Sequence, residues 1–273
     1  MDVLAQFLPT VFVLALGSAI GSFLNVVVYR IPAGLSILHP PSRCPHCLHR
    51  LRRHENVPVL GWLWLRGRCA HCGSPIAVRY PLVEALTGLL FVVTFWVFGF
   101  SWLTVGYWLF FSWLLALALI DVDTMTLPNP LTQSGLIAGL VFQGWLAIAQ
   151  PSGASAIASQ LMTGILGAVV GLWLLELIGN VGSLAFGRTA MGGGDAKLAA
   201  MMGAWLGWKL LLLAGFIACV LGALWGGGAQ VLKVSQRGQV MPFGPFLALG
   251  ALLTAFFGEM AIAAYLRLFF PTL

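Results

Sequence analysis

Residues 102–120 read WLTVGYWLFFSWLLALALI and are followed at once by Asp121-Val-Asp123. An uncharged apolar run of about 20 residues is long enough to cross a bilayer as a helix. Similar runs recur along the chain, and we expect eight spans in all: residues 7–29, 82–98, 102–120, 131–149, 157–178, 199–206, 210–231 and 246–269. The sixth is short, so one long bent span with a re-entrant piece is the alternative for residues 199–231.

The composition supports the same class of protein. Hydrophobic residues make up 60% of the 273-residue chain and charged residues only 8%, whereas soluble proteins have about 25% charged residues. So few charges cannot coat a soluble globule, and the 33 glycines and 11 tryptophans are typical of membrane helices. We therefore predict an all-α polytopic membrane protein with about eight transmembrane helices.

One polar insert, residues 30–81, interrupts the apolar chain. It holds eight arginines against one acid, Glu55, for a net charge of +7, together with all five histidines and four of the five cysteines. Basic loops stay in the cytoplasm. This orientation puts 12 of the 14 basic residues inside and both termini outside. Because it already explains the arginines, nucleic-acid binding is not expected.

The insert divides the chain into three regions: a first span (1–29), a cytoplasmic basic loop (30–81) and a membrane-embedded core (82–273). The start, Met1-Asp2, has no basic segment before the first span. A cleaved signal peptide begins with such a segment. We therefore expect the first span to be an uncleaved anchor.

The cysteines of the loop form two Cys-x-x-Cys pairs 21 residues apart: Cys44 with Cys47, and Cys69 with Cys72. Two such pairs are the ligand pattern of a zinc ribbon, in which four thiolates hold one tetrahedral Zn²⁺. A metal would also stabilise a segment too small for a hydrophobic core. We predict a structural zinc site. The alternatives are two disulfides, which a reducing cytoplasm disfavours, and ligation by His46 or His71.

Two acidic residues stand at span ends. Asp121 ends the third span, and Asp195 follows Gly192-Gly193-Gly194 at the start of the sixth. A carboxylate within a membrane span costs about 3 kcal/mol and often marks function. The expected topology places both at the cytoplasmic edge, where they can meet.

Two carboxyls that share a site do not both ionise. The ionised one can take a proton from water while the protonated one polarises a peptide carbonyl, which is aspartic-protease chemistry. The alternative is that both are simply solvated, with Asp195 capping its helix. Asp123 is a second candidate for the first position, although it lies two residues on and faces another side of a helix.

Several segments together resemble a known family. Gly192-x-Gly194-Asp195 is similar to the Gly-x-Gly-Asp motif of intramembrane aspartic proteases, and the whole set resembles the bacterial type IV prepilin peptidases. The shared segments, which span nearly the whole chain, are Gly21 to Val27, the two cysteine pairs, Tyr80 to Glu84, Asp121 with Leu127-Pro128-Asn129, and Met191 to Asp195.

The resemblance implies a location, a site and two activities. The location is the bacterial inner membrane, with the active site at its cytoplasmic face, and the catalytic pair is Asp121 and Asp195. The first activity is cleavage of the basic leader of prepilins or pseudopilins, which serve pili or secretion. The second is methylation of the new N-terminal amine from S-adenosylmethionine.

The methyl donor has no obvious motif. The loop is the largest polar segment, so we expect the donor at its junction with the bilayer, near Gly67, Arg68 and Glu84. Glu84 has an alternative role as an acid favoured by the dipole at a helix N-terminus.

A different class of function is also compatible with the residues alone. A transporter or channel with a zinc-ribbon sensor loop would use its carboxylates as a cation relay, at staggered depths near the midplane. Asp121 and Asp195 are expected at the same depth, at the cytoplasmic edge of the membrane, which favours the protease over the transporter. A redox role for the cysteines is a third option, but two pairs favour a metal.

Overall fold

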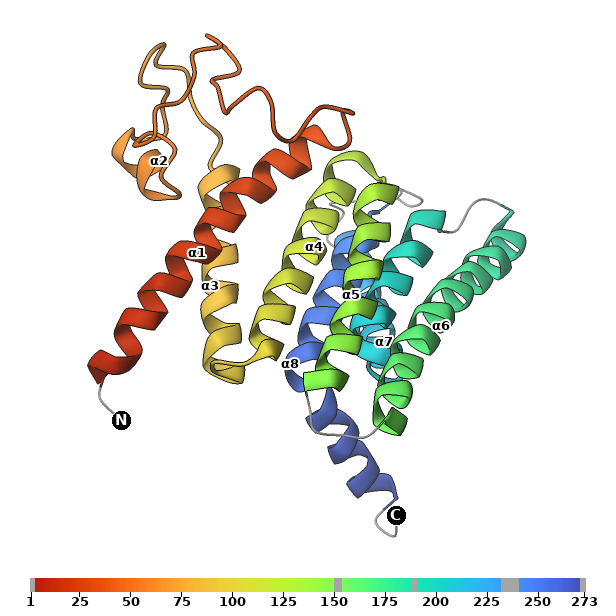
Figure 1. Cartoon of the computed structure of the whole chain (residues 1–273). Coiled ribbons are helices and arrows are strands. Elements are labelled where there is room, and N and C mark those ends of the chain that lie inside the picture. Colours follow the sequence, from red (N-terminus) through yellow and green to blue (C-terminus); the bar gives the residue numbers. More distant parts are fainter. Residues whose placement is uncertain (1–2, 150–153, 188–190, 232–240, 271–273) are drawn as a thin grey trace. The chain divides into compact units, whose positions relative to one another are not determined.

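The computed structural model describes residues 3–149, 154–187, 191–231 and 241–270, and all regular structure within them is helical (Figure 1). The helices are α1 (Val3–Arg30), α2 (Leu60–Trp64), α3 (Arg79–Phe98), α4 (Trp102–Thr124), α5 (Asn129–Ala149), α6 (Ala154–Phe186), α7 (Gly193–Val231) and α8 (Gly244–Phe269). Seven of these described helices are long and apolar enough to cross a membrane. The predicted all-α membrane class is confirmed, whereas the short α2 inside the polar loop was not expected.

The count of spans differs from the eight expected because two of them lie within α7. At Gly207 the backbone leaves the helical region (φ 76°, ψ 169°) and divides α7 into residues 193–206 and 208–231. At about 1.5 Å per residue the first part is about 21 Å long and the second about 36 Å. Glycine suits this position because a side chain would be strained at positive φ.

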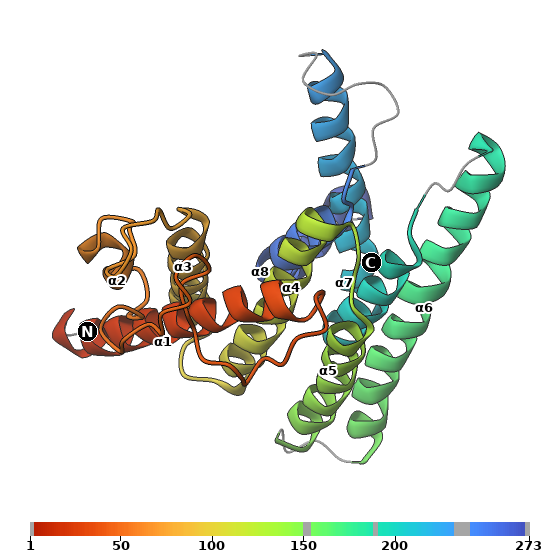
Figure 2. The ribbon, with the colours of Figure 1, turned by 90° about the horizontal axis from the view of Figure 1, so that it is seen from above.

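The chain reverses direction at this break. Gly258 near the end of α8 packs against Leu210, just after the break, and Gly222 packs against Phe243, just before α8 begins. The second part of α7 is therefore antiparallel to α8 and ends where α8 starts. Figure 2 shows the last turns of α7 departing from its first turns. Residues 193–206 and 208–231 are thus two separate helical segments, which correspond to the two apolar runs expected at residues 199–206 and 210–231.

Glycines bring the first part of α7 against α6. Gly167 and Gly203 face each other backbone to backbone, and a Cβ on either would collide with the other's carbonyl oxygen. One turn away, Gly171 packs in the same manner on Ala199. Small residues allow membrane helices to approach this closely and to gain van der Waals contact. This packing fixes where α7 begins relative to α6.

The chain forms two compact units, residues 1–112 and 113–273. In the first, α1 and α3 meet through Gly17, Gly21 and Gly88. Trp108 stacks on Phe91 with ring centroids 5.0 Å apart, and its indole N–H donates to the Phe91 carbonyl at 2.9 Å. The second unit contains the end of α4 and helices α5 to α8. Arg188, Lys233 and Arg237 are among the 12 basic residues that the expected topology places inside, and they lie outside the described residues.

Candidate active site and metal centre

Asp121 and Asp195 come together in the second unit, although 74 positions separate them in the sequence. Asp121 lies in the last turn of α4 and Asp195 in the first turn of α7. Both side chains are buried, with 5% and 8% of their surfaces exposed. They are close enough for the charge of one to act on the other. The structure therefore brings the two predicted aspartates into one buried site.

Asp121 has a backbone partner on a third helix. The N–H of Gly244, the first residue of α8, donates to Oδ2 of Asp121 at 2.9 Å. A Cβ at Gly244 would stand only 2.7 Å from that oxygen. The start of α8 thus offers both a hydrogen-bond donor and the positive end of a helix dipole to this carboxylate. Pro245 follows directly and suits a first helical turn, where no N–H partner is needed.

The segments that carry the aspartates also touch each other beside the site. Leu127, in the connection after α4, packs closely against Gly194, where an added Cβ would lie 3.0 Å from the Leu127 Cβ. Nζ of Lys197 donates to Oδ1 of Asn129 at 2.8 Å. These two contacts hold the connection between α4 and α5 against the first turn of α7.

The remaining glycines of the motif border open space. A Cβ at Gly192 or at Gly193 would meet no atom within 4 Å, and both residues are exposed. An extended peptide can therefore approach the backbone closely next to Asp195. Asp123, the alternative first aspartate, is exposed while Asp121 is buried. The geometry thus favours Asp121 as the partner of Asp195.

The four cysteines of the loop form one cluster. Their Sγ atoms all lie within 4.8 Å of one another. The Cys44–Cys72 separation is 3.8 Å and the Cys47–Cys69 separation is 4.0 Å. Neighbouring sulfurs in a tetrahedral site with Zn–S bonds of about 2.3 Å are about 3.8 Å apart. All five cysteines of the chain are free, so the cluster is suited to a metal ion.

The two Cys-x-x-Cys segments, residues 44–47 and 69–72, form turns that we call knuckles, and the two knuckles share one backbone pattern. In the first, the N–H of Leu48 donates to the carbonyl of Cys44, and in the second the N–H of Gly73 donates to that of Cys69. Leu48 and Gly73 both have positive φ, 58° and 71°. Such turns point successive groups at a common centre.

The histidines lie beside the cysteine cluster. The rings of His49 and His71 stack at 4.4 Å across the two knuckles. Among the residues that the structure describes, the group able to hold a metal consists of the four cysteines and includes neither histidine.

The thiols have unequal acidities. Hydrogen bonding from the backbone of Cys47, and then of His46, lowers the pKa of Cys44 to about 5 against the opposing effect of burial. The backbone of His49 lowers the pKa of Cys47, but burial and the neighbouring thiols raise it to about 12. One thiol is thus readily ionised while its neighbour keeps its proton. A divalent cation would replace such protons and relieve the crowding of negative charge.

The expected methyl-donor residues lie in different environments. Gly67 is buried, and a Cβ there would meet the Trp62 ring at 2.7 Å, while Arg68 is exposed. Glu84 is 9% exposed, and its Oε2 accepts the N–H of Val59 at 2.7 Å. Glu84 therefore anchors the residue before α2 to α3. A methyl-donor site at these residues stays a prediction.

Two structural features of the second unit escaped sequence reasoning. The donor at Gly244 lies 123 positions from Asp121, and the only signal was Pro245, which marks a helix start. The reversal at Gly207 had a weaker signal, the shortness of the apolar run at residues 199–206.

Comparisons with known proteins cover both units. The bacterial peptidase A24 N-terminal domain matches residues 15–98, and the type IV leader peptidase family matches residues 108–227. A prepilin leader peptidase/N-methyltransferase of Stutzerimonas stutzeri is 37% identical over 95% of each chain. Proteins of the same name are 36% identical in Neisseria gonorrhoeae, over 85% of each chain, and 45% identical in Myxococcus xanthus, over 85% of this chain and 65% of the relative. No solved structure matches.

The cysteine cluster predicts about one zinc ion per purified chain. Cys44→Ser should lower the zinc content severalfold and make the loop sensitive to added protease, because three thiolates hold the metal less tightly. Elemental analysis by mass spectrometry measures the metal. Cys219→Ser, an exposed position on α7, is the control and should keep its zinc. Zinc-free protein whose loop thiols react only after reduction would establish disulfides instead.

Proposed function

Because this chain belongs to the type IV leader peptidase family, we propose that it cleaves the basic leader of prepilins or pseudopilins and methylates the new N-terminal amine from S-adenosylmethionine. The observation that carries the proposal is the burial of both Asp121 and Asp195, close enough for the charge of one to act on the other. The names of the relatives, which join the two activities, support it.

The two carboxyl groups divide the work of hydrolysis. The ionised one accepts a proton from a water molecule, whose oxygen attacks the carbonyl carbon of the scissile peptide bond. The protonated one donates to the carbonyl oxygen, and the departing nitrogen takes up a proton as the C–N bond breaks. The N–H of Gly244 stabilises negative charge on Asp121. This assigns the general base to Asp121 and the general acid to Asp195.

The substrate fits this site through its charge and its backbone. A leader of basic residues joined to an apolar helix has its scissile bond at the membrane edge, where α4 ends and α7 begins. The open space at Gly192 and Gly193 accommodates an extended backbone. The exposed carboxylate of Asp123 attracts the basic leader. We place this edge at the cytoplasmic face of a bacterial inner membrane, with both termini in the periplasm.

Methylation requires a separate site for a soluble donor. We keep it near Gly67, Arg68 and Glu84, where the polar loop joins α3. Glu84 is a buried carboxylate at this junction, suited to orient either an amine or a sulfonium. A zinc ion at the four cysteines would keep the loop folded and has no chemical step of its own.

Replacing either aspartate tests the protease assignment. Asp121→Asn and Asp195→Asn should each lower cleavage of a purified prepilin about 1,000-fold or more, because an amide neither accepts nor donates the proton that hydrolysis requires. Mass spectrometry of the products measures cleavage. Asp123→Asn should keep substantial activity, with weaker substrate binding. An essential Asp123 together with a dispensable Asp121 would disprove the assignment.

The start of α8 gives a second, finer test. Gly244→Ala should lower the cleavage rate constant about 100-fold with little change in KM, because its Cβ would displace the Asp121 carboxylate. Gly222→Ala is the matched control, since a Cβ there lies no closer than 3.5 Å to Phe243. Equal effects of the two substitutions would show that Gly244 has no special relation to Asp121.

The two activities should separate by mutation. Asp121→Asn should still methylate a pre-cleaved pilin, whereas Glu84→Gln should lower methyl transfer more than cleavage. Glutamine keeps an acceptor for the Val59 N–H, so the loop anchor survives while the charge is lost. Labelled S-adenosylmethionine measures methyl transfer, and exposed Glu176→Gln is the control. Proportional loss of both activities in every variant would indicate a single site.

A further inference from the structure

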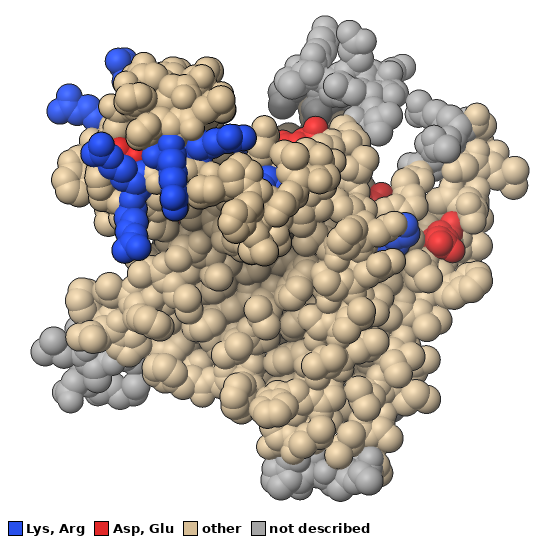
Figure 3. Space-filling view, turned by 45° about the horizontal axis from the view of Figure 1, so that its top comes forward, with Lys and Arg blue, Asp and Glu red and all other residues tan. Residues whose placement is uncertain are grey.

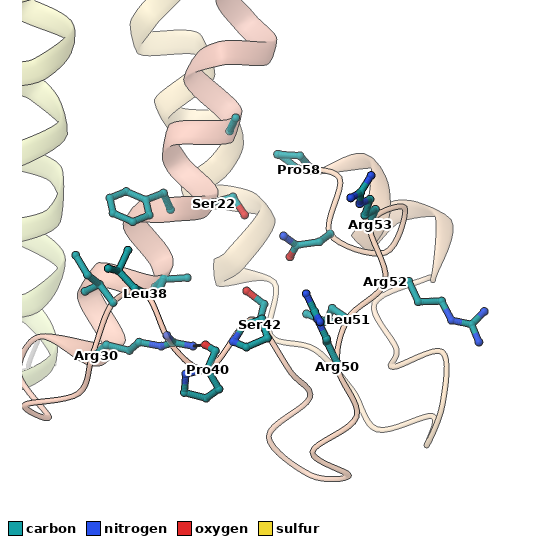
Figure 4. A pocket seen from close by; sticks show the side chains of 16 residues that line it. Ser22, Arg30, Leu38, Pro40, Ser42, Arg50, Leu51, Arg52, Arg53 and Pro58 are labelled. Atoms are coloured by element: carbon teal, nitrogen blue, oxygen red, sulfur yellow. Dashed lines mark hydrogen bonds between the residues drawn. The ribbon is translucent and has the colours of Figure 1, made fainter.

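A cavity of about 560 Å³ lies in the first unit between α1 and the polar loop (Figure 4). One wall is a single face of α1, formed by residues at helical spacing from Ala19 through Phe23 to Arg30. The other walls are two stretches of the loop, around Leu38 and around Arg50 to Pro58. Gly67, Arg68 and Glu84 do not line it, so it is distinct from the expected methyl-donor site.

The cavity is amphipathic. Arg30 ends the candidate membrane span of α1, which puts its guanidinium at the bilayer surface. Ala19, Phe23 and Val26 extend the same wall about 16 Å further along the helix, into the span. The cavity thus has a cationic mouth on the side of the loop and an apolar wall along α1.

The positive charge at the mouth is not neutralised by acids. Four arginines line the cavity and no carboxylate does: Arg30, Arg50, Arg52 and Arg53. The guanidinium of Arg30 donates to the carbonyls of Ser36 (2.9 Å) and Pro40 (2.6 Å), which fixes its place without cancelling its charge. The acid of the loop, Glu55, accepts the backbone N–H of Arg52 and lies outside the cavity lining.

The arginines have different directions. Figure 4 shows Arg30 and Arg50 reaching toward the space between α1 and the loop, whereas Arg52 extends away from it. Figure 3 shows how Lys and Arg gather on this part of the surface. Other exposed arginines of the loop, such as Arg43 and Arg66, are not part of the lining.

We propose that this cavity binds the phosphate head group of one anionic phospholipid, with an acyl chain lying along α1. Arginine pairs readily with phosphate oxygens, and the hydroxyls of Ser22 and Ser42 add donors to the lining. S-adenosylmethionine does not fit, because its sulfonium and ammonium groups outweigh its one carboxylate and the mouth is cationic. This inference is independent of the proposed function.

The test uses the full-length chain in mild detergent, with bound lipid counted by native mass spectrometry. The probes are phosphatidylglycerol, phosphatidylcholine with the same acyl chains, and soluble glycerol 1-phosphate. The wild type should retain one phosphatidylglycerol per chain. Arg50→Gln/Arg53→Gln should weaken that binding about tenfold or more. Arg43→Gln/Arg66→Gln, which removes equal charge from the same loop, should bind as the wild type does.

Three results would overturn the proposal. They are equal binding of phosphatidylglycerol by the two double variants, equal retention of phosphatidylcholine, and displacement of the lipid by glycerol 1-phosphate at comparable concentration, which would indicate a free phosphate ligand. If Arg50→Gln/Arg53→Gln loses zinc, and so is misfolded, the single variants Arg50→Gln and Arg53→Gln replace it. Each should weaken the binding severalfold, whereas Arg43→Gln and Arg66→Gln should not.

Discussion

Burying two carboxyl groups among membrane helices is costly, and much of the second unit is arranged to accommodate them. Asp121 has little exposed surface, and the N–H of Gly244 supplies a hydrogen bond to its carboxylate. Asp195, the proposed general acid, lies in the first turn of α7 within range of the charge on Asp121. The ends of α4, α7 and α8 therefore meet at one point, and the open side of that point is bordered by glycines.

The convergence depends on close backbone packing further along the helices. Gly167 and Gly203 let α6 and the first part of α7 touch, which sets the position of Asp195. The reversal at Gly207 then returns the chain along α8, so that Phe243 and Gly244 end beside α4. Because Gly167 and Gly203 have no side chains, the two helices pack at a short, fixed distance. That distance also fixes the position of Asp195 at the start of α7.

The polar loop is stabilised in a different way, since it has few apolar residues with which to build a core. Two knuckles with equal turns bring four sulfurs within 4.8 Å, and Glu84 holds the residue before α2. Its arginines stay solvated or face the cavity at the end of α1, and no acid neutralises that cavity. The loop thus combines a centre suited to a metal with a surface suited to anionic membranes.

The sequence by itself determined the membrane class and most of the spans, and it singled out the cysteine quartet and the two aspartates, because hydropathy and short spacings are local patterns. It also indicated the separate character of residues 199–206, but not that the chain turns back at Gly207. Only the tertiary structure decided that Asp121, and not Asp123, is buried, that Gly244 is its donor, and that Glu84 anchors the loop. The cavity along α1 was likewise found only in the tertiary structure. These depend on distances between residues far apart in the chain, which packing sets and which no local pattern records.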